Sequence, residues 1–144
     1  TEEVEKAAKM ASVHNEILRF ENGYETVVGE RGVMLSGGQK QRISIARVLI
    51  HDHKIVICED CLSAVDAKTE KEVLGNLYEY LRDRTAIVIT HRIFSLFDFD
   101  KIIVLEDGNI VEEGKHDSLM EKDGIYAMMY RRQQQEDHDE NEQQ

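Results

Sequence analysis

Two short, uninterrupted apolar runs restrict the folds open to this chain more than any other feature. Residues 54–58 (KIVIC) and 85–90 (TAIVIT) are each bounded by polar or charged residues. Such runs are typical of strands that are buried on both faces of a parallel sheet. Between them, residues 67–82 place apolar side chains on one helical face, at Val73, Leu74, Leu77, Tyr78 and Leu81. This strand–helix–strand order predicts an α/β fold with parallel strands.

The rest of the sequence predicts helices and a hairpin around these strands. A third strand is expected at 101–105, and Asp107-Gly108 then forms a tight turn into 109–111. Residues 21–35 contain three glycines and are expected to form a loop. The predicted helices are 2–20 (with a break near 12–15), 38–50, 67–82 (with Asp66 as N-cap), 117–122 and 125–132.

The charge of the chain is acidic and unevenly distributed. Its 18 Lys and Arg residues stand against 29 Asp and Glu, a formal net charge of −11. Residues 133–144 hold five of these acids and no Lys, Arg or apolar residue, which predicts a disordered acidic tail. The acidic balance argues against a nucleic acid or an anionic membrane surface as partner. No apolar run is long enough for a membrane span, and the two cysteines suggest no disulfide scaffold, so we expect a reduced, cytoplasm-facing domain.

A serine and two glycines stand directly before the helix predicted at 38–50. In the segment 35–39 (LSGGQ), the glycines let backbone N–H groups approach a ligand, and Ser36 can cap the helix and offer a hydroxyl. A helix N-terminus also carries positive partial charge and free N–H donors. A Ser-Gly-Gly alone more often only leads into a helix, but here the residues that follow favour a phosphate-binding surface.

Polar residues follow both predicted strands. The acids Glu59 and Asp60 come after the first strand, and His91 comes after the second. Ligands of open parallel sheets bind outside the carboxyl ends of the strands. An acid pair there suits Mg²⁺ coordination and the polarisation of an attacking water, and a histidine suits contact with a terminal phosphate. The spacing therefore predicts a phosphate-transfer site at this edge.

In this order, the segments resemble the ATP-binding cassette of ABC transporters, over residues 1 to about 132. The matching stretches are the exporter-type loop at 26–32 (TVVGERG), the signature motif at 35–39, Walker B at 55–60, the D-loop at 63–66 (SAVD), the switch histidine at 91 and the closing hairpin at 104–114. The resemblance implies an incomplete P-loop NTPase fold of the ABC type. It implies part of a helical subdomain at 1–50, the C-terminal part of the ATPase core at 51–132, and the disordered tail at 133–144.

The resemblance also implies roles in ATP hydrolysis, with ATP and Mg²⁺ as ligands. Glu59 would hold Mg²⁺ through water, Asp60 would orient the attacking water, and His91 would contact the γ-phosphate. In the family the signature motif acts in trans, on ATP bound to a second nucleotide-binding domain. The residues that would hold the γ-phosphate of the partner's ATP are Ser36, Gly37, Gly38 and Gln39.

Two further partners follow from the resemblance. Ser63 and Asp66 of the D-loop would couple the two ATP sites across the dimer of nucleotide-binding domains. Glu30 and its neighbours would face the coupling helices of a transmembrane domain. The chain would then lie at the cytoplasmic face of a membrane, as part of an integral membrane exporter, with no nucleic acid partner.

The largest departure from the family is that no segment matches the Walker A pattern, G-x-x-x-x-G-K-[ST]. The sequence thus corresponds to the C-terminal half of a cassette. We expect the chain alone to bind ATP weakly or not at all, and not to hydrolyse it. We also expect part of its sheet to be uncovered and its stability in isolation to be poor.

The second departure is the order of the two acids. The D-loop register places Asp60 where hydrolysing members have Glu, and Glu59 where they have Asp. Asp is one methylene shorter than Glu, so Asp60 should reach the attacking water less well. With the signature motif intact, this favours the slow-site subunit of an asymmetric heterodimer. The alternative is a symmetric homodimer that tolerates Asp60.

Other interpretations remain open at this point. A soluble ABC-type ATPase is disfavoured by the exporter-type form of residues 26–32 and 63–66, and a non-catalytic regulatory module by the intact signature motif. Cys58 and Cys61 form a C-x-x-C, but Cys58 fills a strand position and no second pair exists. The sequence therefore predicts neither a redox pair nor a zinc knuckle here.

Overall fold

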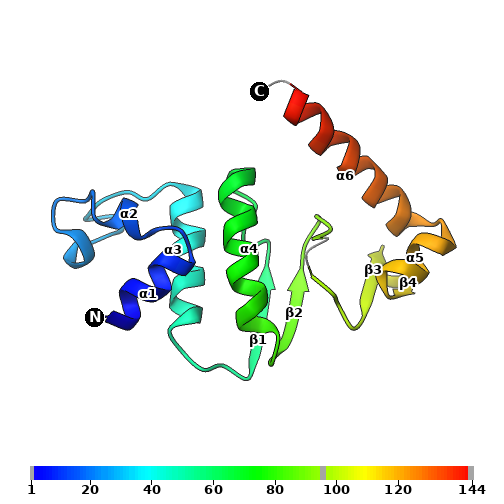
Figure 1. Cartoon of the computed structure of the whole chain (residues 1–144), viewed down its shortest axis with the longest axis horizontal. Helices are drawn as coiled ribbons and strands as arrows, with labels where there is room; N and C mark the ends of the chain where they lie inside the picture. Colours follow the sequence, from blue (N-terminus) through cyan, green and yellow to red (C-terminus); the bar gives the residue numbers. More distant parts are fainter. Residues whose placement is uncertain (1, 95–96, 143–144) are drawn as a thin grey trace. The chain divides into compact units, whose positions relative to one another are not determined.

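A computed structural model describes residues 2–94 and 97–142 of the chain. It divides into two compact units, Thr1–Thr90 and His91–Gln144, drawn in blue to green and in green to red (Figure 1). The combination of helices with parallel strands confirms the predicted α/β class. The boundary predicted at residue 50 concerns subdomains of a complete cassette and stays a prediction.

The first unit contains the predicted strand–helix–strand core and the helices before it. The predicted break in the first helix is confirmed, because Ser12 takes a left-handed φ of 52° between α1 and α2. The elements of this unit are α1 (Glu2–Met10), α2 (His14–Ile17), the 3₁₀ turn η1 (Gly23–Glu25), α3 (Gly37–Leu49), β1 (Ile55–Glu59), α4 (Ala67–Leu81) and β2 (Thr85–Ile89).

Strands β1 and β2 pair in parallel, with Ile55 opposite Thr85 and Glu59 opposite Ile89. Parallel neighbours need a crossover connection, and α4 provides it (Figure 1). Asp66 begins this helix as predicted, since its side chain accepts a hydrogen bond from the Thr69 N–H. The carboxyl ends of both strands therefore lie at the same edge of the sheet.

The core of the first unit lies on one face of this sheet. Val56 and Cys58 of β1 point to that face, where the buried apolar side chains also include Ile45, Leu62, Val73, Leu74, Leu77 and Leu81. The alternate residues Ile55 and Ile57 are 64% and 65% exposed. Burial on both faces, as predicted from the continuous apolar runs, is therefore wrong for the described residues, because helices pack on one face only.

The second unit contains the predicted hairpin. Strands β3 (Ile102–Glu106) and β4 (Asn109–Gly114) pair antiparallel, with a bulge between Val104 and Leu105. The turn residues Asp107 and Gly108 have φ values of 50° and 77°, as a two-residue turn of the I′ type requires. Helices α5 (His116–Lys122) and α6 (Ile125–Glu142) follow.

A buried carboxylate joins β4 to the start of α6. Glu112 is 5% exposed, and its Oε2 accepts a hydrogen bond of 2.7 Å from the Tyr126 N–H. A carboxylate is stabilising at this end of a helix, because the first N–H groups there have no partner within the helix. Glu112 also crowds Gly124, where a Cβ would lie 1.9 Å from its Oε1, so only glycine fits that position without rearrangement.

Helix α6 corrects the predicted disordered tail, because it runs to Glu142 instead of ending near residue 132. The Gln133 amide exchanges two hydrogen bonds with the backbone of Ile93, and Arg132 pairs with Glu136 one turn later. Glutamine and glutamate are good helix formers, and no glycine or proline interrupts the segment. Within the described parts of the chain, no helix has the length and apolar character that crossing a membrane requires.

Candidate functional site

The signature segment ends in a capping box at the start of α3. The Ser36 Oγ accepts a hydrogen bond of 3.2 Å from the Gln39 N–H, and the Ser36 N–H donates one of 2.9 Å to the Gln39 Oε1. This S-x-x-Q pattern satisfies two backbone donors reciprocally. Ser36 and Gly37 are exposed, so the positive end of the helix faces solvent. The predicted capping role of Ser36 is confirmed, and the helix begins at Gly37.

Gln39 is also held from the side by a network that sequence reasoning missed. Its Nε2 donates a hydrogen bond of 2.8 Å to Glu16, and Arg42 forms an ion pair of 2.6 Å with the other oxygen of Glu16. Arg42 also donates to the Ser12 carbonyl, at the break between α1 and α2. The signature helix is thereby fixed to the preceding helices. No spacing rule connects Glu16 with Gln39, because they lie 23 residues apart in the chain.

The network around Glu16 changes the pKa of its carboxyl group. Partial burial raises its pKa, but the hydrogen bonds from Arg42 and Gln39 and the charge of Arg42 lower it by more. The net pKa is therefore lower than the ordinary value for glutamate. Glu16 stays ionised and keeps Gln39 in place.

The signature glycines lie directly against the D-loop, residues 63–66. A Cβ on Gly37 would come within 3.3 Å of the Ala64 Cβ. A Cβ on Gly38 would come within 2.7 Å of the Ala64 carbonyl oxygen, a backbone atom that cannot easily move away. The approach of the two motifs therefore requires glycine at position 38 and leaves little room for a Cβ at position 37.

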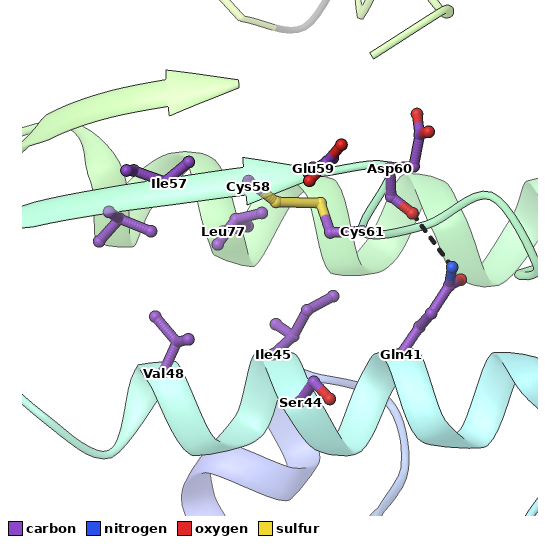
Figure 2. A pocket seen from close by; sticks show the side chains of 11 residues that line it. Gln41, Ser44, Ile45, Val48, Ile57, Cys58, Glu59, Asp60, Cys61 and Leu77 are labelled. Atoms are coloured by element: carbon purple, nitrogen blue, oxygen red, sulfur yellow. Dashed lines mark hydrogen bonds between the residues drawn. A yellow bond between two sulfur atoms is a disulfide. The ribbon is translucent and has the colours of Figure 1, made fainter. Parts of the chain in front are cut away.

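Gln41 connects α3 with the D-loop and with the acid pair. Its Nε2 donates hydrogen bonds of 3.0 Å to the Asp60 carbonyl and 2.8 Å to the Ser63 hydroxyl. Its Oε1 accepts a hydrogen bond of 2.9 Å from the Ala64 N–H. Figure 2 shows this side chain reaching from α3 to the backbone of Asp60. Sequence reasoning missed Gln41, because a single glutamine on a helix carries no signal of its own.

The two acids lie at the carboxyl end of β1, as predicted. Glu59 is the last residue of the strand, and Asp60 starts the following turn with a left-handed φ of 42°. The Asp60 N–H donates to the Ile89 carbonyl, so the turn stays attached to the end of β2. Both side chains are exposed. Among the described residues, no group of three potential metal ligands is present, so the acids alone do not complete a metal site.

This arrangement still fits Mg²⁺ chemistry. Mg²⁺ keeps several waters and takes only one or two protein carboxylates together with substrate phosphates. Two adjacent carboxylates that are open to solvent, Glu59 and Asp60, provide such oxygen ligands. The remaining coordination positions would belong to water and to the phosphates of a nucleotide.

Among the other predicted site residues, the D-loop residues lie beside the signature motif and the acid pair, and Glu30 lies in a separate loop. Asp66 caps α4, and the hydrogen bonds from Thr69 lower the pKa of its carboxyl. Ser63 is held between Gln41 and the Asp60 carbonyl. Glu30 is exposed in a loop that is closed by a bridge between Val28 and Val33.

His91 is the first residue of the second unit and is exposed there. It follows β2 by two residues, as the sequence predicted from the order of the strands. Its predicted contact with a γ-phosphate stays a prediction.

Cys58 and Cys61 form a disulfide, with their Cα atoms 5.8 Å apart. The predicted reduced pair is therefore wrong for this structure. Three residues of sequence separation, with a tight turn at Asp60, bring the two sulfurs together. The C-x-x-C spacing was the available signal, and the strand position of Cys58 was a poor reason to set it aside.

A cavity of about 260 Å³ lies beneath the acids, between α3 and β1 (Figure 2). Its wall is largely apolar, with contributions from Ile45, Val48 and Leu77. Cys58, Cys61 and the two acids border it on the side of the strand. The cavity therefore adjoins the candidate site, and both acids are among the residues that line it.

Comparison with known proteins extends these observations. The model of the family described as ABC transporter matches residues 1–63. The multidrug resistance-like ATP-binding protein MdlA of Escherichia coli (strain K12) is 52% identical over 133 residues, which is 92% of this chain and 22% of that protein. The ATP-dependent lipid A-core flippase of the same strain is 45% identical over 132 residues, 92% of this chain and 23% of the flippase.

A mitochondrial relative and a solved structure agree with these matches. The iron-sulfur clusters transporter ATM1 of Gibberella zeae is 44% identical over 135 residues, 92% of this chain and 19% of that protein. The structure of a bacterial Atm1-family ABC exporter with ATP bound is 43% identical, with a TM-score of 0.78, over 91% of this chain and 23% of that one. The chain thus spans about a fifth of the length of the proteins it matches.

Proposed function

This chain belongs to the ABC transporter family, as the C-terminal part of an exporter-type nucleotide-binding domain, and from this we propose that it serves ATP-driven transport across a membrane. The observation that carries the proposal is the exposed N-terminus of α3, packed against the D-loop through Gly37 and Gly38. An exposed helix start with a serine cap is a ready anion-binding surface. The full-length protein would hydrolyse ATP, and this chain alone would not, since it contains no Walker A segment.

The signature residues would act on ATP held by a second nucleotide-binding domain. The free N–H groups of Gly37 and Gly38 and the hydroxyl of Ser36 would approach the γ-phosphate of that ATP. Gln39 is held by Glu16 and by the Ser36 backbone, so it would position the loop at little further entropic cost. The motif would thus supply prearranged donors to charge that develops during phosphoryl transfer.

The acid pair would serve the ATP bound on the same subunit. Bound Mg²⁺ would neutralise charge on the β- and γ-phosphate oxygens, with Glu59 holding it through water. Asp60 would orient the water that attacks the γ-phosphate, and His91 would contact the same phosphate. Because the Asp60 backbone is hydrogen-bonded to Gln41 and Ile89, the carboxylate cannot easily advance to replace the missing methylene.

We therefore propose that the ATP site of this subunit is slow and that a partner subunit has the fast one. Misplacing a catalytic group by about 1 Å can cost on the order of 10²-fold in rate. The signature motif, in contrast, has its full set of residues and a fixed geometry. A heterodimer would combine these two properties, with Ser36–Gln39 of this chain completing the fast site of its partner.

The remaining surfaces would connect the cassette to the rest of the transporter. Ser63 and Asp66 would transmit the state of one ATP site to the other across the dimer. Glu30 would face the coupling helices of the transmembrane domain, from a loop whose Val27 is 71% exposed. The cassette would then lie at the cytoplasmic face of the membrane.

The test compares two substitutions in the full-length protein, purified together with its partner. Ser36→Arg should abolish ATP turnover, because a long side chain would block the helix N-terminus that serves the fast site. Asp60→Asn should reduce turnover by less than about twofold, because the slow site contributes little to the total. Equal losses would refute the asymmetry, and an absence of ATP turnover by the unsubstituted protein would refute the proposed function itself.

A further inference from the structure

The Cys58–Cys61 disulfide encloses the acid pair. Cys58, in β1, is 8% exposed, and Cys61, in the following turn, is partly exposed. The two residues between them are Glu59 and Asp60. Figure 2 shows the sulfur–sulfur bond on the side of the strand that faces α3, with the Asp60 carboxylate pointing away from it. The covalent ring therefore contains the backbone of both residues assigned to Mg²⁺ and water.

The ring holds this turn in one conformation. Asp60 has a φ of 42°, in the left-handed region that few non-glycine residues adopt. Its N–H and C=O are both hydrogen-bonded, to Ile89 and to Gln41 respectively. The Asp60 carbonyl also accepts hydrogen bonds from the N–H and the hydroxyl of Ser63. With the disulfide broken, only hydrogen bonds would hold the turn, and the backbone of Asp60 could relax further.

The pair can also exchange with small thiols. The cavity between α3 and β1 is bordered by both cysteines, and Cys61 is accessible enough for attack. Closely spaced C-x-x-C pairs are the ones that serve in thiol–disulfide exchange. In a reducing compartment, disulfides are typically transient and sense the redox state instead of stabilising the fold.

We propose that Cys58 and Cys61 form a reversible dithiol–disulfide switch, whose disulfide form slows ATP turnover by restraining the turn at Asp60. This inference rests on the proposed function. An aspartate needs movement of its backbone to bring its carboxylate to the attacking water, since it lacks one methylene of glutamate. The disulfide adds a covalent restraint to the hydrogen bonds that oppose this movement, and reduction to the dithiol removes that added restraint.

The oxidant is a low-molecular-weight disulfide such as glutathione disulfide. The thiolate of Cys61 attacks one sulfur of glutathione disulfide and forms a mixed disulfide, releasing one glutathione. The thiolate of Cys58 then attacks the Cys61 sulfur and releases the second glutathione. The two cysteines lose two protons and two electrons, and one glutathione disulfide becomes two glutathione molecules. Excess glutathione reverses both steps.

The experiment uses the full-length protein with its partner in buffers of defined glutathione to glutathione disulfide ratio. The free thiols are alkylated with N-ethylmaleimide. The mass of the tryptic peptide 55–68, which contains both cysteines, then gives the number of alkyl groups. We expect two alkyl groups in excess glutathione and none in excess glutathione disulfide. ATP turnover should fall on oxidation by at most the loss that Asp60→Asn causes, less than about twofold, and it should return with dithiothreitol.

The control is Cys61→Ala, which removes the switch but none of the groups assigned to ATP or Mg²⁺. This variant should turn over ATP at the rate of the reduced protein, and excess glutathione disulfide should not change that rate. The inference is overturned if both cysteines remain alkylated in excess glutathione disulfide, if turnover is the same in both redox states, or if Cys61→Ala is inhibited equally. An absence of turnover in the reduced protein would instead overturn the proposed function, and the switch with it.

Discussion

Two neighbouring side chains of α3 hold loops on different sides of the signature motif. Gln41 reaches the D-loop and Asp60, whereas Arg42 reaches Glu16 and the Ser12 carbonyl. Successive residues of a helix point about 100° apart, which is why adjacent positions can serve opposite neighbours. The position of the signature motif is thus determined by side chains that lie just behind it.

At the residue scale, we predict that Gln41→Ala lowers the free energy of unfolding by about 1–3 kcal/mol. The substitution removes hydrogen bonds to the Asp60 carbonyl, the Ser63 hydroxyl and the Ala64 N–H. Urea unfolding of the chain measures the change. Lys40→Ala is the matched control, since Lys40 is exposed on the same helix and should change stability by less than about 0.5 kcal/mol. Equal stability of the two variants would contradict the bridging role of Gln41.

The lowered pKa of Glu16 predicts a specific pH dependence. Because the folded pKa is lower than the unfolded one, the stabilisation is complete above the ordinary glutamate pKa of about 4.3. It is lost as the pH falls below that value through the lowered pKa. Wild type should therefore lose more stability between about pH 6 and pH 3 than Glu16→Gln does. Parallel pH profiles from urea unfolding would contradict the role of Glu16, and Glu21→Gln, at an exposed position, should follow the wild type.

At the scale of elements, the contact between α3 and the D-loop depends on the absence of side chains. The signature glycines open the helix N-terminus to a ligand and also let the D-loop backbone approach it. The same pair of residues thus serves binding and packing. A substitution that leaves the helix itself intact should still separate the two motifs.

We predict opposite effects for Gly38→Ala and Gly75→Ala. A Cβ on Gly38 meets the Ala64 carbonyl oxygen at 2.7 Å, so the D-loop must shift, at a cost of about 1–3 kcal/mol. A Cβ on Gly75, within α4, meets nothing within 4 Å and should stabilise the chain by about 0.5–1 kcal/mol. Thermal or urea unfolding of both variants tests the pair. A Gly38→Ala chain that is as stable as Gly75→Ala would contradict the close packing.

The order of these elements could be predicted from the sequence, because it depends on local patterns. Apolar runs gave β1 and β2, and the spacing of apolar residues together with Asp66 gave α4. The extent of α6 could not be predicted, because its last turns follow helix propensity and the distant contact of Gln133 with Ile93, not apolar periodicity. The hydrogen-bond partners of Glu16 and Gln41 could not be predicted either, because these contacts join segments that are far apart in the chain.

For the molecule as a whole, the uncovered face of the parallel sheet is the main feature. Ile55, Ile57, Ile87 and Ile89 share this face and are about half exposed or more. Contiguous exposed apolar surface is unusual on a soluble domain and marks a place where other structure packs. This agrees with a chain that spans about a fifth of the proteins it matches. The absence of a Walker A segment led to the prediction that part of the sheet would be uncovered. The apolar runs alone suggested burial on both faces.

The missing phosphate-binding loop leads to the prediction for the whole molecule. The chain alone should bind Mg-ATP with an affinity weaker than micromolar, because the N-terminus of α3 offers only one prearranged group of donors to the phosphates. Calorimetric titration measures this affinity directly. Any weak binding that is observed should disappear in Ser36→Arg, which blocks the helix start, and should persist in Lys40→Ala. Micromolar affinity in the unsubstituted chain would contradict this prediction, because it would show that the phosphates have a second site here.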